Sequence, residues 1–200
     1  SVNHNSRKFH AKNTDPERSC LNVEYCNENI KDVYHELFDE AFAQYNEKQT
    51  RSDRRIDDYY EKIRFGKQEK PFHEIILQIG DKDNMGAKTE NGQLAAKVLD
   101  KYMQDFQRRN PTLRVFSAYL HMDEATPHIH AAVVPIVTGE RRKTREKQTD
   151  DPSKRKYRTK SASRPRLCAD DVMSRVKLKE YQDTYAEAMS KYGLQRGIDG

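Results

Sequence analysis

Apolar residues recur three and four positions apart in three stretches of the chain, which is the spacing of an amphipathic helix. The pattern predicts helices over residues 29–45, 93–109 and 170–192. Residues typical of helix ends support these bounds, because an asparagine opens the first stretch, Asn91-Gly92 precede the second and a glycine follows the third.

Shorter runs rich in branched and aromatic residues predict strands over residues 72–79, 113–120 and 129–134. Their short connections and antiparallel-compatible order favour an α+β fold, an antiparallel sheet with helices packed on it. A chain of 200 residues has room for one domain of ordinary size. We therefore expect residues 1–200 to form a single domain.

Charge is distributed unevenly along the chain. The formal net charge is +5 and the pI is near 9.0, which is a weak indication of a nucleic-acid partner. Residues 139–166 hold twelve Lys and Arg against four Asp and Glu, a local net charge of +8. This segment has almost no apolar residue to bury, so we expect it to be a mobile basic loop.

Cysteine usage and hydropathy indicate the compartment. Cys20, Cys26 and Cys168 form an odd set without C-x-x-C spacing, which suits a reducing cytoplasm. No apolar run approaches the roughly 20 residues needed to cross a bilayer, so we expect no transmembrane segment. The chain starts at Ser1 without a methionine and ends at Gly200 after an expected helix, which suggests a piece of a longer protein.

The ten residues from 121 to 130 read H-M-D-E-A-T-P-H-I-H and contain three of the seven histidines. In a strand, His128 and His130 project from the same face about 7 Å apart along the chain. His121 belongs to the preceding strand, where it shares the parity of Val115 and Tyr119. The connection is short, so we expect all three imidazoles to converge on one face of a hairpin.

Three imidazoles leave coordination positions open, which is typical of a catalytic metal site and not of a closed structural one. Imidazole accepts several divalent metals, so the residues alone do not name the ion. Asp123 and Glu124 lie between the two strands. A carboxylate there can orient a ligand imidazole or accept a proton from a nucleophile, and we expect Glu124 to face the site.

Residues 121–135 resemble the third motif of the MobV-type relaxases, the Mob/Pre plasmid mobilisation and recombination proteins of the HUH endonuclease superfamily. His4-Asn5-Ser6-Arg7 resembles the first motif of that family, HNxR. Residues 15–22, D-P-E-R-S-C-L-N, resemble its N-P-x-R-S-x-x-N region. The resemblance therefore spans nearly the whole chain with its motifs in the same order.

This resemblance implies a relaxase catalytic domain over residues 1–200, with a twisted antiparallel sheet and helices. It implies strand- and site-specific nicking of plasmid transfer-origin DNA for conjugative mobilisation, on DNA that is single-stranded near the nick, with a hairpin as one form of the target. The divalent cation would be Mn²⁺ first and Mg²⁺ second, held by His121, His128 and His130. The family also implies a plasmid-encoded bacterial protein of the cytoplasm, a strand before the first motif, and dimerisation through a C-terminal tail.

The resemblance also implies a histidine nucleophile, His4, joined to the DNA 5′ phosphate as a phosphoramidate. A neutral imidazole nitrogen is nucleophilic near pH 7, so the chemistry is reasonable. Glu124 would take the proton of His4 or set its tautomer, and Arg7 would add a positive contact to the phosphate. Asn5 and Asp123 are expected just outside these groups.

Alternatives remain open at the level of sequence. Tyr25 is a second candidate nucleophile, followed by Tyr59 and Tyr60. A tyrosine nucleophile would fit a rolling-circle replication initiator, which shares the histidine pair. A third hypothesis is a non-catalytic DNA-binding module in which the metal only stabilises the hairpin of strands.

Two groups of basic residues are candidate DNA contacts, because Lys and Arg neutralise phosphates and release counterions without reading sequence. The first group stands at the start of an expected short helix and the second in the basic segment. They are Arg51, Arg54 and Arg55, and then Arg141, Arg142, Lys143, Arg145, Lys154, Arg155, Lys156 and Arg158.

Overall fold

A computed structural model describes residues 2–9, 12–138 and 165–195. Its strands form one antiparallel sheet in the order β1-β3-β4-β2, with β5 paired to the far end of β4. The strands are β1 (Val23–Asn27), β2 (His73–Gln78), β3 (Leu113–His121), β4 (His128–Val137) and β5 (Arg166–Leu167).

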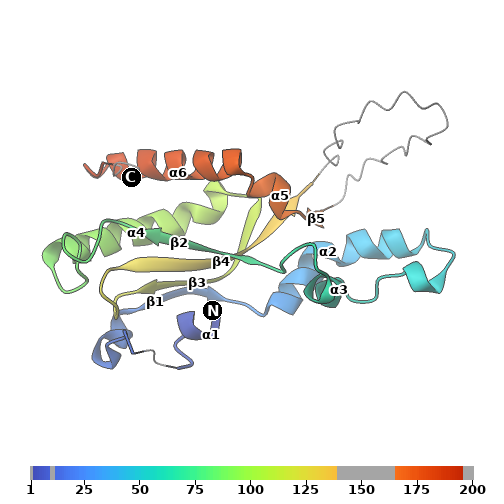
Figure 1. The fold of residues 1–200 in the computed structure, drawn as a ribbon, viewed down its shortest axis with the longest axis horizontal. Helices are drawn as coiled ribbons and strands as arrows, with labels where there is room; N and C mark the ends of the chain where they lie inside the picture. The colour runs from blue at the N-terminus through green and yellow to red at the C-terminus, as the bar shows by residue number, and fades with distance from the viewer. Residues whose placement is uncertain (1, 10–11, 139–164, 196–200) are drawn as a thin grey trace.

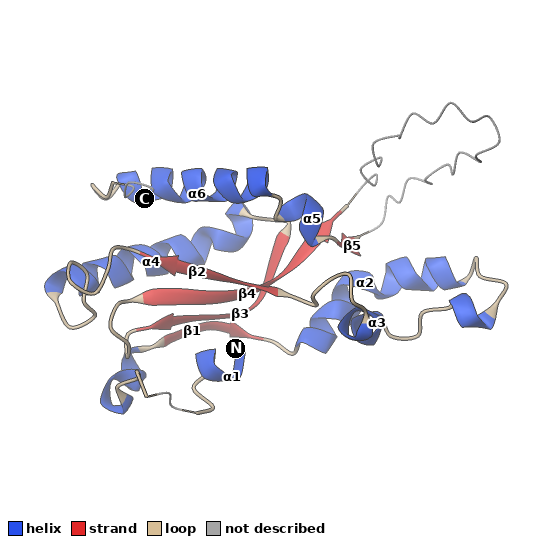
Figure 2. Ribbon diagram, in the orientation of Figure 1, coloured by secondary structure: helices blue, strands red, loops and turns tan. Residues whose placement is uncertain are grey.

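Helices lie on both faces of this sheet (Figure 1). The long α4 covers one face and α6 packs beside it, whereas α1 lies on the opposite face and α2 and α3 lie toward one end (Figure 2). The α-helices are α1 (Val2–Asn5), α2 (Ile30–Asn46), α3 (Tyr59–Phe65), α4 (Glu90–Arg109), α5 (Ala169–Val172) and α6 (Arg175–Ser190). Two 3₁₀ helices span Pro16–Leu21 and Ser52–Arg54.

The larger part of the core lies between α4 and the sheet. The apolar stripe of α4, centred on the fully buried Leu99, packs on Ile129, Ala131 and Val133, which face one side of β4. Beside this stripe, α4 meets α6, where the rings of Tyr102 and Tyr185 lie 5.0 Å apart. The Tyr185 hydroxyl also donates to the Gln78 backbone oxygen of β2 at 3.1 Å. Because this stripe is buried, the helical spacing of apolar residues over 93–109 correctly predicted a helix there.

A second apolar cluster covers one end of the other face. Tyr34 and Phe38 of α2 pack on Phe116, Ala132 and Val134, which project from β3 and β4. The rest of that face carries the histidines. The sheet is thus divided into a fully covered face and a face shared between an apolar end and a polar end.

A β-bulge between Val115 and Ser117 sets the face of every later residue in β3. Val115 pairs with Val133 on the α4 face, whereas Tyr119 pairs with His130 and shares its face. The expectation that Val115 lies on the same face as the histidines was therefore wrong, because the extra residue in the bulge reverses the alternation.

The expected α+β class is confirmed, and the predicted strands appear with small shifts at their ends. The second helix begins earlier than predicted, because Thr89 caps it with a hydrogen bond from the Gly92 N–H, so Asn91-Gly92 lie inside its first turn. The third predicted helix is two helices. Ser174 starts the second of them by accepting from the Lys177 N–H.

Strands β1 and β5 were not anticipated, since both are short and lack a long apolar run. Arg166, the last residue of the expected basic loop, pairs with Val137 in β5. Residues 139–164 of that loop lie outside the described residues. Among the described helices, none combines the length and the apolar character needed to span a bilayer.

Gly92 allows the start of α4 to approach the loop at Gly86. A Cβ at position 92 would lie 2.0 Å from the Gly86 carbonyl oxygen. Alanine normally stabilises a helix by about 1 kcal/mol relative to glycine. Here we expect Gly92→Ala to lower the free energy of unfolding by about 1–3 kcal/mol, because backbone must move to relieve the contact. Urea denaturation measures this, and the exposed Gln93→Ala should stay within about 0.5 kcal/mol of the parent.

Candidate functional site

Three histidines converge on the polar end of the sheet. The register of β3 and β4 places His121 directly opposite His128, and His130 follows two residues along the same face. One nitrogen from each ring lies within 4.8 Å of the others. His121 is completely buried and His128 is 8% exposed, so the group lies just beneath the molecular surface. The predicted convergence is thus present in the structure.

The orientation of His121 is set by α1. Its Nε2 donates to the backbone oxygen of Asn5 at 2.9 Å, which requires the proton to be on Nε2. Nδ1 is therefore unprotonated, and within the described part of the chain this buried nitrogen has no hydrogen-bond partner. A buried lone pair aimed at two other imidazoles fits a metal ligand.

The other two rings are held in the same manner. His128 Nδ1 donates to the Thr126 carbonyl at 2.8 Å, and His130 Nδ1 donates to Glu74 Oε1 at 2.9 Å. In a neutral ring with its proton on Nδ1, the Nε2 lone pair is available to a metal. Partners of this kind orient ligand imidazoles in metal sites. The residues present therefore fit a divalent cation bound by three neutral nitrogens.

Burial keeps two of these rings in the metal-binding form. Burial lowers the pKa of His121 to about 4, and nearby Arg7 and the other histidines act in the same direction. The pKa of His130 is also lowered, first by burial and then by His128. Neither ring has to lose a proton near pH 7 before it can bind a cation.

His4 lies beside this group. It belongs to α1, and its ring stands edge-on to that of His121 with centroids 6.2 Å apart. His4 Nε2 is 3.5 Å from Glu124 Oε1 and 3.2 Å from Arg7 Nη1. The structure therefore brings together residues 4 and 124, which lie far apart in the sequence.

Arg7 joins α1 to the connection between β3 and β4. Its Nε and Nη2 bind the two carboxylate oxygens of Asp123 at 2.9 and 2.5 Å, and Nη2 also binds Glu124 at 2.8 Å. Burial alone would raise the pKa of Asp123, but hydrogen bonds from Arg7 and Ser19 outweigh it and keep the pKa well below its usual range. The Arg7 donors are thus directed at protein groups.

The backbone of Arg7 is also unusual. Its φ is +52°, and no other non-glycine residue of the described ranges has a positive φ. This left-handed conformation costs a residue with a side chain about 1–2 kcal/mol. The paired hydrogen bonds to Asp123 offset that cost.

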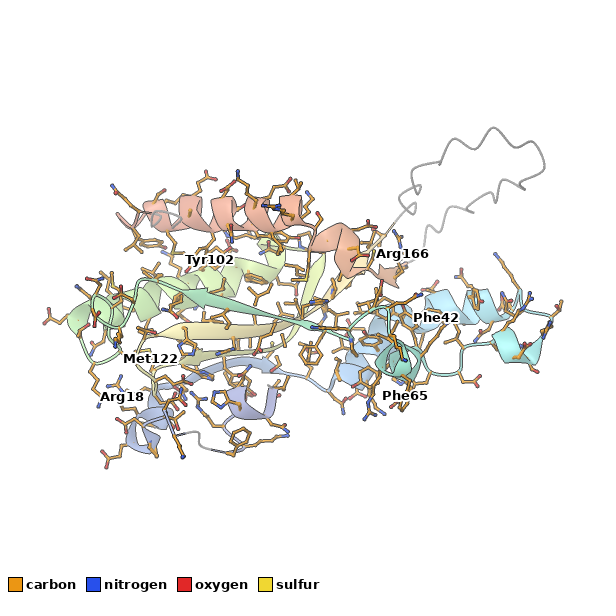
Figure 3. All side chains as sticks on the ribbon, viewed as in Figure 1. Arg18, Phe42, Phe65, Tyr102, Met122 and Arg166 are labelled. Carbon is orange, nitrogen blue, oxygen red and sulfur yellow. The ribbon has the colours of Figure 1, made fainter. Side chains whose placement is uncertain are left out.

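A second segment clamps the same connection. Residues 15–22, which resemble a family motif, bind the backbone or side chains of Met122 and Asp123 at four points. Arg18 and Met122, which form one of these contacts, are labelled in Figure 3. The four groups are the Asp15 N–H, the Arg18 guanidinium, the Ser19 hydroxyl and the Asn22 side-chain oxygen. This motif therefore has a structural role in holding Asp123 and Glu124.

Sequence reasoning missed Glu74, Thr126 and Asn13. Glu74 lies in β2 on the same face as His130, and Asn13 donates to Glu124 Oε2 at 2.8 Å. The alternation in residues 72–79 was visible, but the face on which Glu74 lies depends on the register between β2 and β4. Thr126 contributes only a backbone oxygen, which has no sequence signal.

The tyrosine alternatives lie elsewhere. The Tyr25 hydroxyl donates to Asp100 of α4 at 2.8 Å, on the face opposite the histidines. Tyr59 and Tyr60 pack around Tyr34 in the cluster under α2 and α3. None of these three hydroxyls belongs to the histidine group.

Three of the candidate DNA contacts lie among the described residues, and these three stand away from the histidines. Arg51, Arg54 and Arg55 are exposed on the connection between α2 and α3, at the end of the molecule away from α1 (Figure 1), and Arg51 pairs with Asp53 at 2.8 Å. The remaining eight candidates lie outside the described residues. They are Arg141, Arg142, Lys143, Arg145, Lys154, Arg155, Lys156 and Arg158.

Comparison with known families identifies this arrangement. The Mob_Pre family, described as plasmid recombination enzyme, matches residues 1–200. The chain belongs to the Mob_Pre family. This confirms the resemblance drawn from the histidine, HNxR and residue 15–22 motifs. No curated protein sequence matches the chain significantly.

Solved structures of a Mob_Pre relaxase domain share the fold. One is the MobM relaxase domain (MobV) bound to 22 nucleotides of plasmid pMV158 oriT DNA with manganese, at a TM-score of 0.56 and 24% identity. The match covers 98% of this chain and 81% of that chain. A second, with 23 nucleotides of the same DNA, gives a TM-score of 0.51 and 22% identity over 98% and 80%. At these identities the likeness establishes the fold.

The depressed pKa of His121 predicts how stability depends on pH without metal. The unfolded imidazole binds a proton below pH 6.5, while the folded one does so only near pH 4. Stability should therefore fall as the pH drops through this window, by on the order of 3 kcal/mol from this group. Urea denaturation of metal-free protein between pH 7 and 4 measures the slope.

His121→Gln removes this titration and should flatten the curve, even though its stability at pH 7 also changes. Gln93→Ala changes an exposed residue of α4 that does not titrate and should leave the slope intact. An unchanged slope in His121→Gln would contradict the buried neutral state.

Proposed function

We propose that this protein is a metal-dependent DNA relaxase that nicks one strand of a plasmid transfer origin and becomes attached to the 5′ phosphate through His4. One observation carries the proposal. His4 lies beside a three-histidine group fitted for a cation, and its Nε2 is 3.5 Å from the Glu124 carboxylate. Membership of the Mob_Pre family supports DNA processing for plasmid mobilisation in bacterial cytoplasm.

His121, His128 and His130 are the residues that would hold the cation. Mn²⁺ is the first candidate, since the MobM structures contain manganese, and Mg²⁺ is the second. When bound, the cation supplies Lewis-acid polarisation of the scissile phosphate. The chain's contribution is to keep three unprotonated nitrogens directed at one point and two rings neutral near pH 7.

The covalent step belongs to His4. One ring nitrogen attacks phosphorus, a P–N bond forms, and the bond from phosphorus to the 3′ oxygen breaks. The imidazole loses its proton to Glu124, the carboxylate 3.5 Å away, and the departing 3′ oxygen takes up one proton, so that one proton passes overall from the imidazole to the leaving group. The phosphoramidate keeps the energy of the broken ester, so the 3′ hydroxyl can later reverse the step and religate the strand.

Arg7 and Asp123 position these groups. Arg7 donates to the His4 backbone oxygen at 3.1 Å and to both acidic side chains, so it fixes the nucleophile relative to the proposed base. For Arg7 to contact the phosphate as expected, it would have to share N–H donors that bind Asp123, Glu124 and the His4 backbone oxygen in this structure. We therefore assign Arg7 chiefly to positioning.

DNA away from the nick would contact the basic surfaces. Arg51, Arg54 and Arg55 and the basic segment 139–166 would neutralise phosphates, which predicts salt-sensitive binding without sequence reading. Recognition of a DNA hairpin and assembly as a homodimer are further predictions that rest on the family resemblance alone.

The nucleophile can be identified directly. Incubation with supercoiled transfer-origin plasmid and Mn²⁺, followed by denaturing electrophoresis and peptide mass analysis, should reveal a DNA adduct on His4. His4→Ala should bind the DNA but form no adduct, because it lacks the attacking nitrogen.

Tyr25→Phe is the matched control and should nick normally, since its hydroxyl is engaged on the other face of the sheet. An adduct on tyrosine would refute the histidine nucleophile and favour a replication initiator. Binding without any nick by the parent protein would favour a non-catalytic module.

Metal binding is tested separately from the chemistry. His128→Ala should lower Mn²⁺ affinity by more than the ~10–100-fold typical of changes outside the ligand set, because it removes a ligand nitrogen. Isothermal titration of the metal-free protein measures this. His35→Ala, on the surface of α2, should bind Mn²⁺ as the parent does. Equal affinity of the His128 variant and the parent would contradict the assigned ligands.

A further inference from the structure

Asn5 contacts one metal-ligand candidate directly and the hydrogen-bond partner of a second. Its backbone oxygen accepts from His121 Nε2 at 2.9 Å. Its side-chain Nδ2 donates to Glu74 Oε1 at 2.5 Å, and the same oxygen accepts from His130 Nδ1 at 2.9 Å. A continuous chain of hydrogen bonds therefore runs from His130 through Glu74 to the residue next to His4.

This chain of contacts is buried at Asn5 and partly exposed at Glu74. Asn5 is 2% exposed, and the side chain of Glu74 is 31% exposed. Burial opposes ionisation of Glu74, but the hydrogen bonds from Asn5 and His130 outweigh it and lower its pKa. Glu74 is thus a charged acceptor shared between a metal-ligand ring and α1.

The helix that carries His4 needs such a restraint. α1 has four residues, which is far too short for a helix to be stable by itself. Its position therefore depends on side-chain contacts with the sheet. Arg7 supplies one group of contacts at the Asp123 side, and Asn5 supplies the other at the histidine side.

We propose that Asn5 and Glu74 are positioning residues that couple cation binding at the three histidines to the placement of His4. A cation bound to Nε2 of His130 would fix the orientation of that ring and hence the direction in which its Nδ1 donates to Glu74. Glu74 in turn holds the Asn5 side chain. By reciprocity, a well-placed α1 increases cation affinity to the same extent. The inference rests on the proposed function for the role of His4, but the coupling itself does not require DNA.

A simpler possibility is that Glu74 only orients His130, as carboxylates do in many metal sites. The two possibilities differ at Asn5, which touches no ligand with its side chain. If Glu74 acts on His130 alone, loss of the Asn5 amide leaves cation affinity unchanged. If the contact couples the two elements, affinity falls.

The first test measures Mn²⁺ affinity and amide hydrogen exchange in the DNA-free protein. In the parent, Mn²⁺ should slow exchange in residues 2–9. Asn5→Ala should lower Mn²⁺ affinity at least ~5-fold, the lower range of allosteric coupling, and should remove the Mn²⁺-dependent slowing. Parent-like affinity and slowing in Asn5→Ala would overturn the proposal.

A reciprocal exchange tests the contact itself and covers the case in which Asn5→Ala misfolds. Asn5→Asp places two carboxylates against each other, whereas Asn5→Asp combined with Glu74→Gln restores a donor and an acceptor at the parent's net charge. The double variant should regain the Mn²⁺-dependent slowing that Asn5→Asp lacks. A double variant no better than Asn5→Asp would overturn the coupling.

Glu28→Gln is the matched control, because Glu28 is also paired with a basic residue of the sheet, Arg114, but stands away from the histidines. It should match the parent in both measurements. Adduct formation at saturating Mn²⁺ then separates the two proposals. A parent that forms no adduct refutes the proposed function, whereas a normal parent with an unimpaired Asn5→Ala refutes only the coupling.

Discussion

The antiparallel register between β3 and β4 is the constraint on which the rest of the site depends. It places His121 opposite His128 with His130 beside them, and one bulge before Ser117 determines that all three share a face. A shift of one residue would send His121 to the α4 side of the sheet. The packed α4 face opposes such a shift, because Ala118 and Leu120 of β3 would lose their buried positions.

The second organising interaction is the buried pair of Arg7 and Asp123. The Asp123 side chain is fully buried and that of Arg7 is 10% exposed, so removing Arg7 would leave the Asp123 carboxylate without an opposite charge at a cost of about 3–5 kcal/mol. This pair joins a terminal segment to the turn between the central strands. It explains why four residues of helix can present His4 at a defined place.

The site combines neutral imidazoles with ionised carboxylates at different positions. Burial suppresses protonation of His121, while hydrogen bonds keep Asp123 ionised a few residues away. A group of neutral imidazoles beside ionised carboxylates suits a cation and a proton acceptor, respectively. Glu124 is close to both the proposed nucleophile and a ligand candidate, since it lies 3.5 Å from His4 and 3.7 Å from His121.

Sequence by itself determined the fold class, the main helices, the central hairpin and the convergence of His121, His128 and His130, because these follow from periodicity and from neighbours along the chain. Recognisable motifs also indicated His4 and Arg7. Only the tertiary structure decided that Val115 faces away from the histidines, that Glu74 and Asn5 link the ligand candidates to α1, and that Tyr25 lies on the far face. These outcomes depend on a bulge, on strand register and on contacts between distant segments, which local spacing does not encode.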